Sequence, residues 1–291
     1  MRGPVLAVVG LLCALACRAE VSAVDDSGRK VTLTSAATRV ISLAPHLTEL
    51  VFAIGAGEAV KGVIRFSDHP AAARTLPLVG DAFALDFETI ARLKPDLVLV
   101  WGSGQNERHK ARLRGLGLTL FESDIRKPEA IADTMRRLGI LLGQGVNAAR
   151  AAADFEQTWQ ALRERHAGKP PLRVFWQLWN DPLMTVNREH LIGAALVACG
   201  ATNVFGELPL LTPTVAWEAA VAADPQLIVG SGGAQDSKQD FARWRRFPQV
   251  SAVRREHFAR IDGDLIGRMG PRFVQGAAAL CDAVDRARAA P

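Results

Sequence analysis

The sequence predicts an α/β protein made of two Rossmann-like lobes, each with a parallel sheet, that are joined by one long rigid helix. Three observations support this fold class. Short apolar runs typical of buried strands alternate with segments of helical spacing along most of the chain. Several motifs of the first half recur in the same order in the second half. A stretch without Pro or Gly, residues 146–167, lies between the two halves.

Residues 24–145 contain the elements of the predicted N-terminal lobe. The run at 40–43 is β-type, and the helix that follows it, at 47–54, ends before Gly55. Further elements are expected at 60–64, 97–101, 107–116, 119–122 and 128–142. Strands and helices that alternate in this way imply a parallel sheet with helices on both faces.

Residues 146–167 form the predicted bridging helix. Apolar side chains such as Ala152, Phe155 and Trp159 recur at helical spacing along it, and its length corresponds to about six turns. Gly168 and the prolines that follow it would end the helix.

Residues 168–291 form the predicted C-terminal lobe. Its elements are expected at 173–178, 190–199, 227–229, 257–261 and 271–288. Glu88 precedes the strand entry at Pro95 by seven residues, and Glu218 precedes the strand entry at Pro225 by the same distance. Matches in the same order predict two related lobes. The alternative is that unrelated α/β units share these strand-entry signals.

Residues 1–23 are typical of an export signal. Arg2 is followed by an uncharged apolar run, 5–16, which is shorter than the about 20 residues that a membrane-spanning helix needs. We therefore expect a periplasmic protein that does not insert into the membrane after cleavage.

The cleavage position has three candidates, Ala16, Ala19 and Ala23, of which Ala23 is preferred. Cys17 offers lipid anchoring as an alternative, although Ala14 stands where a lipobox prefers leucine.

Two cysteines, Cys199 and Cys281, remain in the exported chain. An even pair in an oxidising compartment predicts a disulfide. The bond would close a loop of roughly 80 residues, worth about 4 kcal/mol in the chain-entropy model. The alternative is two buried thiols in alanine-rich helices.

Composition and missing motifs exclude several function classes. The formal net charge is +5 and the basic residues are scattered, without the basic stripe of a nucleic-acid-binding protein. There is no nucleophile-elbow, Walker, Cys-x-x-Cys or His-Glu-x-x-His motif, so nothing demands catalysis, a metal or a cofactor. His46 could be a metal ligand, and an ordinary loop histidine is the alternative.

The predicted ligand site is a cleft between the lobes, because ligands of open parallel sheets bind beyond the carboxyl ends of the strands. Aromatic rings would cover a large flat ligand there, and dispersed polar groups would orient it. For each tryptophan, core packing is the alternative. The predicted cleft residues are Pro45, His46, Arg65, Phe66, Phe83, Trp101, Gly102, Trp176, Trp179, Asp264 and Arg268.

Three motifs of the first half carry a family resemblance. They are Arg39-Val40-Ile41-Ser42-Leu43-Ala44-Pro45 with Thr48-Glu49-Leu50, Ser67-Asp68-His69-Pro70, and Leu93-Lys94-Pro95-Asp96-Leu97-Val98. Together they resemble the periplasmic binding proteins of ABC importers for cobalamin, haem and iron–siderophores. The resemblance covers essentially the whole exported chain. It implies the class III architecture, in which two α/β lobes joined by one rigid helix move little.

Within that family, the sequence is most similar to the members that bind cobalamin. Trp101-Gly102 and the segment from Asp264 to Arg268 resemble their ligand loops, and the two cysteines match their disulfide. Phe66 and Phe83 depart from that pattern, standing where those proteins have Tyr and Trp. A further pocket tryptophan is replaced by Thr212.

The resemblance therefore implies cobalamin or a related corrinoid as the transported ligand, with no cofactor held by the protein. Haem or a ferric siderophore is the alternative of the same fold. A secreted metal-ion carrier or hydrolase that uses His46 with Glu49 or Asp68 is a second one.

The resemblance also implies a partner. In this family one acidic residue on each lobe docks onto arginines of the membrane permease, and Glu88 and Glu218 match those positions. Exposed carboxylates held far apart suit a partner with two-fold symmetry. The alternative is two solvated glutamates at helix starts. We expect the binding protein itself to be a monomer.

Overall fold

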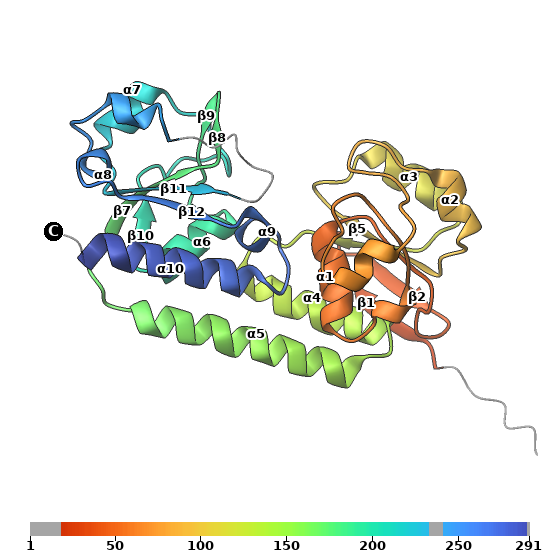
Figure 1. Cartoon of the computed structure of the whole chain (residues 1–291). Coiled ribbons are helices and arrows are strands. Elements are labelled where there is room, and N and C mark those ends of the chain that lie inside the picture. The colour runs from red at the N-terminus through yellow and green to blue at the C-terminus, as the bar shows by residue number, and fades with distance from the viewer. Residues whose placement is uncertain (1–18, 233–240, 290–291) are drawn as a thin grey trace, which may run out of the picture.

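The computed structural model describes residues 19–232 and 241–289 as two α/β lobes on the same side of one long helix, α5 (Gly145–His166) (Figure 1). The predicted fold class is confirmed. Ala16 and Cys17 lie outside the described residues, as does most of the predicted export signal.

The N-terminal lobe combines an antiparallel hairpin, β1-β2, with a parallel sheet in the order β4-β3-β5-β6. Its strands are β1 (Val21–Val24), β2 (Lys30–Leu33), β3 (Val40–Ser42), β4 (Val60–Val63), β5 (Leu97–Trp101) and β6 (Leu120–Ser123). Its helices are α1 (Pro45–Ala53), α2 (Phe87–Arg92), α3 (Glu107–Gly115) and α4 (Pro128–Leu141), with 3₁₀ turns η1 (Gly57–Ala59) and η2 (Ala71–Thr75).

The C-terminal lobe has a parallel sheet in the order β10-β7-β11-β12 and a small antiparallel pair, β8-β9. Its strands are β7 (Leu172–Gln177), β8 (Trp179–Asn180), β9 (Leu183–Met184), β10 (Ala201–Asn203), β11 (Leu227–Ser231) and β12 (Phe258–Ile261). Its helices are α6 (Leu191–Ala198), α7 (Trp217–Ala222), α8 (Ser251–Arg254), α9 (Gly263–Ile266) and α10 (Phe273–Ala289), with the 3₁₀ turn η3 (Trp244–Arg246).

The two sheets have the same topology and the same anchoring hydrogen bonds. Counted along the chain within each parallel sheet, the second strand lies at the edge beside the first, and the third and fourth follow on the other side of the first. In the N-terminal lobe, the Asp96 carboxylate accepts a hydrogen bond from the backbone N–H of Arg39 at 3.0 Å. In the other lobe, the Gln226 side chain accepts one from the backbone N–H of Arg173 at 3.0 Å. The Arg39 side chain donates to the carbonyl oxygen of Leu93, the residue after α2. In the same way, the Arg173 side chain donates to the carbonyl oxygen of Ala223, the residue after α7.

Helix α5 connects the lobes through a continuous apolar face. Ala148, Ala152, Phe155, Trp159 and Leu162 are buried along one side of it, a spacing that follows the helical repeat. These side chains belong to one core that includes buried residues of both sheets and of α4, α6 and α10. The predicted bridging helix, 146–167, corresponds to α5.

A disulfide joins Cys199, at the end of α6, to Cys281 in α10, as the sequence predicted. Both side chains are fully buried. The bond therefore holds together two helices of the C-terminal lobe that lie next to α5.

The hairpin strand β1 begins at Val21 and pairs with β2 along its whole length, from Val21 opposite Leu33 to Val24 opposite Lys30. The preferred cleavage after Ala23 would remove all of this strand except Val24. Cleavage after Ala19 would leave the strand intact.

Candidate functional site

The first candidate cavity, of about 350 Å³, lies at the carboxyl ends of the N-terminal strands. It brings together Pro45, Arg65, Phe66, Phe83 and Trp101 of the predicted cleft residues. Its other lining residues are Leu43, Ala44, Ile64, Asp81, Ala82, Gly104 and Gln105. We call it the N-lobe cavity.

Two local backbone features place the aromatic rings of the N-lobe cavity at its rim. Phe66 has a φ of 68°, in the left-handed region, and its side chain is 60% exposed. Phe83 is 90% exposed at the tip of a turn that follows Gly80, where φ is 128° and a Cβ would lie 2.2 Å from the Ala84 carbonyl oxygen. The Asp81 carboxylate accepts hydrogen bonds from the backbone N–H groups of Phe83 and Ala84, which lower the pKa of Asp81.

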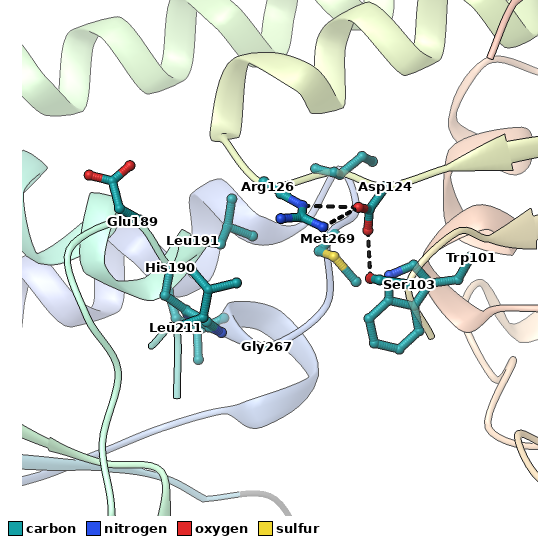
Figure 2. A pocket seen from close by; sticks show the side chains of 12 residues that line it. Trp101, Ser103, Asp124, Arg126, Glu189, His190, Leu191, Leu211, Gly267 and Met269 are labelled. Atoms are coloured by element: carbon teal, nitrogen blue, oxygen red, sulfur yellow. Dashed lines mark hydrogen bonds and ion pairs between the residues drawn. The ribbon is translucent and has the colours of Figure 1, made fainter. Parts of the chain in front are cut away.

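The second cavity, of about 250 Å³, lies between the lobes (Figure 2). The N-terminal lobe supplies Trp101, Ser103, Asp124, Ile125 and Arg126. The C-terminal lobe supplies Glu189, His190, Leu191, Leu211, Ile266, Gly267 and Met269. We call it the inter-lobe cavity. Trp101 lines both cavities, so this one ring connects them.

Gly104 and Lys110 hold the loop that begins at Trp101 in place. Gly104 lets the ring pack closely, because a Cβ there would lie 2.0 Å from a ring carbon. The Lys110 ammonium donates to the Gly102 carbonyl oxygen at 3.0 Å and to the Glu122 carboxylate at 2.8 Å. Burial alone would lower the pKa of Lys110, but its bonds to Glu107 and Glu122 raise it. The buried Lys110 ammonium, which stays charged at ordinary pH, therefore holds the Trp101 loop in place.

Asp124 is also held in place on the wall of the inter-lobe cavity. Its carboxylate accepts a hydrogen bond from the Ser103 hydroxyl at 2.6 Å and pairs with the Arg126 guanidinium at 2.7 Å (Figure 2). Burial would raise the pKa of Asp124, and these two partners outweigh that effect and lower it. The charges of Asp124 and Arg126 thus compensate each other inside the cavity.

His46 packs against the Trp101 ring and lines neither cavity. The two rings meet edge to face, with centroids 5.7 Å apart. The His46 side chain is 3% exposed, and its Nε2 has no hydrogen-bond partner among the described residues. Burial, reinforced by the positive charge of Arg268, lowers the pKa of His46 to about 3. The imidazole is therefore neutral at ordinary pH.

Arg268 joins the lobes instead of projecting freely into the cleft. Its guanidinium contacts the carboxylates of Glu49 at 3.1 Å, Asp68 at 2.9 Å and Asp264 at 2.8 Å. Arg272 contacts the same Glu49 carboxylate at 2.7 Å. The Glu49 side chain is 1% exposed. We call these five residues the inter-lobe ion-pair cluster.

Two further predicted residues, Trp179 and Gly102, occupy different environments. Trp179 is 47% exposed on β8, and its Nε1–H donates to the Asp181 carbonyl oxygen. Gly102 lies between Trp101 and Ser103, and its backbone N–H donates to the Ser123 carbonyl oxygen.

Trp176 requires a correction. The sequence placed it in the cleft, but its side chain is fully buried in the shared core. The reason is that β7 is an inner strand, paired with β10 on one side and β11 on the other. The ring lies on the sheet face that packs in the shared core with buried residues of α6 and α10.

Sequence reasoning missed part of the C-terminal wall of the inter-lobe cavity, namely Glu189, His190 and Leu191. His190 is the first residue of a predicted helix, and this position could have drawn attention to it. Asp124 and Arg126 follow β6 and could have been found from the sequence. The carboxyl end of β6 lies on the same side of the parallel sheet as the carboxyl ends of the other strands, where ligands bind.

The acidic residues with a predicted docking role are both exposed in the first turn of a short helix. Glu88 belongs to α2 and Glu218 to α7. The two helices lie at the far ends of their lobes from α5 (Figure 1).

Residues 19–232 and 241–289 contain neither a metal-ligand cluster nor a helix suited to span a membrane. Within these ranges, no three or more His, Cys, Asp or Glu side chains are grouped as metal ligands would be. None of the helices there combines the length and apolar character needed to cross a membrane.

Comparisons with known proteins match this architecture. The vitamin B12-binding protein of Vibrio cholerae serotype O1 is 32% identical over 245 residues, which cover 84% of this chain and 88% of that protein. The crystal structure of the periplasmic vitamin B12-binding protein of Vibrio cholerae matches with a TM-score of 0.78 at 32% identity, over 87% of this chain and 98% of that one. A periplasmic haem-binding protein in complex with two haems matches with a TM-score of 0.77 at 25% identity, over 86% and 99%.

The sequence profile of one family, described as periplasmic binding protein, matches residues 40–265. That match spans both lobes and α5, and the relative from Vibrio cholerae extends the similarity to most of the chain. The chain belongs to the periplasmic binding protein family.

Proposed function

We propose that this protein captures cobalamin or a related corrinoid between its lobes and delivers it to the permease of an ABC importer, without chemical change to the ligand. The observation that carries the proposal is the position of Trp101, which lines both cavities. A single broad ring system could therefore contact both lobes around this side chain. The 32% identity to the vitamin B12-binding protein of Vibrio cholerae supports this choice of ligand.

The charges of the site also favour a corrinoid over an anionic chelate. Arg268 is already paired with three carboxylates, and Arg126 with Asp124. Anionic siderophores and haem propionates would gain most from unpaired arginines. The exposed Arg65 at the rim of the N-lobe cavity is the cation that remains most accessible among the predicted cleft residues.

Haem is the second candidate ligand. It is favoured by His46, whose neutral imidazole keeps an Nε2 without a partner among the described residues. The haem-binding protein with a TM-score of 0.77 has the same fold. His46 lines neither cavity but contacts the Trp101 ring, which lines both.

The deciding experiment is a calorimetric titration of the purified exported chain with cyanocobalamin, dicyanocobinamide, haemin and a ferric siderophore. We expect 1:1 binding of the two corrinoids. Haemin binding with a Soret shift, together with no heat from either corrinoid, would replace the first proposal by the second.

We further propose that Glu88 and Glu218 dock the loaded protein onto the permease. Their exposure, and the equivalent positions of α2 and α7 before β5 and β11, support a symmetric contact from both lobes. Carboxylates at such a surface would steer association with arginines of the partner.

We propose export through the N-terminal segment, with cleavage before β1. Cleavage after Ala19 keeps the pairing of Val21 with Leu33. The mass of the protein purified from the periplasm would separate cleavage after Ala19 from cleavage after Ala23, and would also reveal a lipid on Cys17.

A further inference from the structure

His190 occupies an unusual position on the wall of the inter-lobe cavity. It is the N-cap residue of α6, and its Nδ1 accepts a hydrogen bond from the backbone N–H of Ile192 at 3.1 Å. Helix N-caps are normally Ser, Thr, Asp or Asn. A histidine at this position caps the helix with one ring nitrogen and leaves the second for another partner.

The cap fixes the protonation of the ring. The Ile192 amide can only donate, so the Nδ1 of His190 must carry a lone pair, and the hydrogen of the neutral ring must lie on Nε2. Burial lowers the pKa of His190 to about 4, so the ring is neutral at ordinary pH. Among the described residues, Nε2 has no hydrogen-bond partner.

The charged groups around His190 are paired. Glu189, which also lines the inter-lobe cavity, contacts the Arg188 guanidinium at 3.5 Å. Facing it across the inter-lobe cavity, Asp124 and Arg126 are paired with each other (Figure 2). Leu191, Leu211 and Met269 supply apolar walls. A neutral N–H donor in such surroundings is suited to a neutral acceptor, because an anion would meet no unpaired cation there.

We propose that the Nε2–H of His190 donates a hydrogen bond to a carboxamide oxygen on the edge of the bound ligand, and that His190 is a specificity-determining residue of this site. This inference rests on the proposed corrinoid function, since the corrin ring carries carboxamide side chains. It assigns the C-terminal wall of the inter-lobe cavity to the amide-bearing edge of the ligand. The apolar rim around Phe66 and Phe83 then faces the rest of the ring system.

The decisive variants are His190→Asn and His190→Asp. Both side chains can offer an oxygen to the Ile192 N–H and have nearly the same shape, but only asparagine keeps an N–H donor for the cavity. Cyanocobalamin affinity, measured by calorimetry at pH 7, should stay within about 3-fold of wild type for asparagine. It should fall at least about tenfold for aspartate.

Three further measurements separate this proposal from the alternatives. Thermal midpoints of the two variants should agree, because both keep the cap, whereas a purely structural role would change midpoint and affinity together. His257→Ser removes a histidine that contacts the Gln226 carbonyl oxygen away from both cavities, and should not change affinity. In ¹⁵N spectra of the free protein, the Nδ1 of His190 should be the unprotonated ring nitrogen.

Equal cyanocobalamin affinities for the asparagine and aspartate variants would overturn the role of His190 and leave the proposed function standing. An absence of cyanocobalamin binding by the wild-type protein would overturn the proposed function, and this assignment with it.

Discussion

At the scale of single residues, burial decides what the polar groups beside the cleft can do. His46 and His190 are both held neutral by burial, to pKa values of about 3 and about 4, yet only His190 lines a cavity. Trp101 and Trp176 differ in the same way, since the first lines both cavities and the second is fully buried. Residue type alone does not separate a ligand-contacting ring from a core ring.

His46 predicts a specific pH dependence of stability. In the unfolded chain its imidazole takes up a proton as the pH falls through 6.5, whereas in the folded protein it does so only near pH 3. The unfolded state binds more protons over this interval, so the free energy of unfolding decreases as the pH falls. His46→Phe should remove this contribution. The stability of wild type relative to the variant should then drop by about 2 kcal/mol between pH 6 and pH 4.

Urea denaturation at a series of pH values measures that difference. Subtracting the variant removes the contribution of the carboxylates, which titrate in both proteins. Parallel pH profiles for wild type and variant would contradict the burial of a neutral His46.

Alanine variants of Phe83 and Trp176 should distinguish a residue needed for ligand affinity from one needed for stability. Phe83→Ala removes a ring that is 90% exposed, so the free energy of unfolding should stay unchanged, while ligand affinity falls by about 1–2 kcal/mol. Trp176→Ala should instead cost about 3–5 kcal/mol of stability, because it empties a fully buried position. Calorimetric titration and urea denaturation of both variants provide the comparison. Loss of affinity without loss of stability in Trp176→Ala would show that the ring reaches the ligand.

At the scale of elements, the C-terminal lobe depends on the contact of α6 with α10, which the Cys199–Cys281 disulfide closes. The sequence separation of 82 residues corresponds to about 4 kcal/mol in the chain-entropy model. Replacing both cysteines by alanine should lower the free energy of unfolding by about that amount. Reductant should destabilise the wild type in urea denaturation and leave the double variant unaffected; an equal response of both proteins would contradict the prediction.

Periodic patterns and repeated motifs made much of the fold predictable at this scale. The strand entries at Pro95 and Pro225 and the long apolar stripe of α5 depend on local sequence. Strand β10 was not expected, because Ala201–Asn203 has no apolar run. Without β10, strand β7 would lie at the edge of its sheet, although it is in fact an inner strand.

The candidate site was less predictable because its chemistry depends on distant pairings. Arg268 appeared free in the sequence, but its partner Glu49 lies 219 positions earlier. Local spacing carries no information about that contact. His190 had no recognisable motif; its bond to the Ile192 N–H is local, but its place on the wall of the inter-lobe cavity depends on how the two lobes pack.

At the scale of the whole molecule, the duplicated lobes place one acidic residue on each side of the cleft. Replacing both Glu88 and Glu218 by glutamine should abolish corrinoid uptake by cells and leave the affinity of the purified protein unchanged, because neither residue lines a cavity described here. Each single variant should reduce uptake less than the pair. A tenfold loss of affinity in the double variant would show that these residues belong to the binding site and not to the docking surface.

The inter-lobe ion-pair cluster has a consequence for how cargo enters and leaves. Glu49 is held by arginines of the opposite lobe in a nearly dry environment, and separating such charges costs several kcal/mol. With α5 packed against both lobes as well, the unloaded protein already has the geometry that receives its cargo. Uptake should then proceed in one kinetic step, with an observed rate linear in cargo concentration. Unloading would have to be driven by the transporter, which must supply the work of pulling those charges apart.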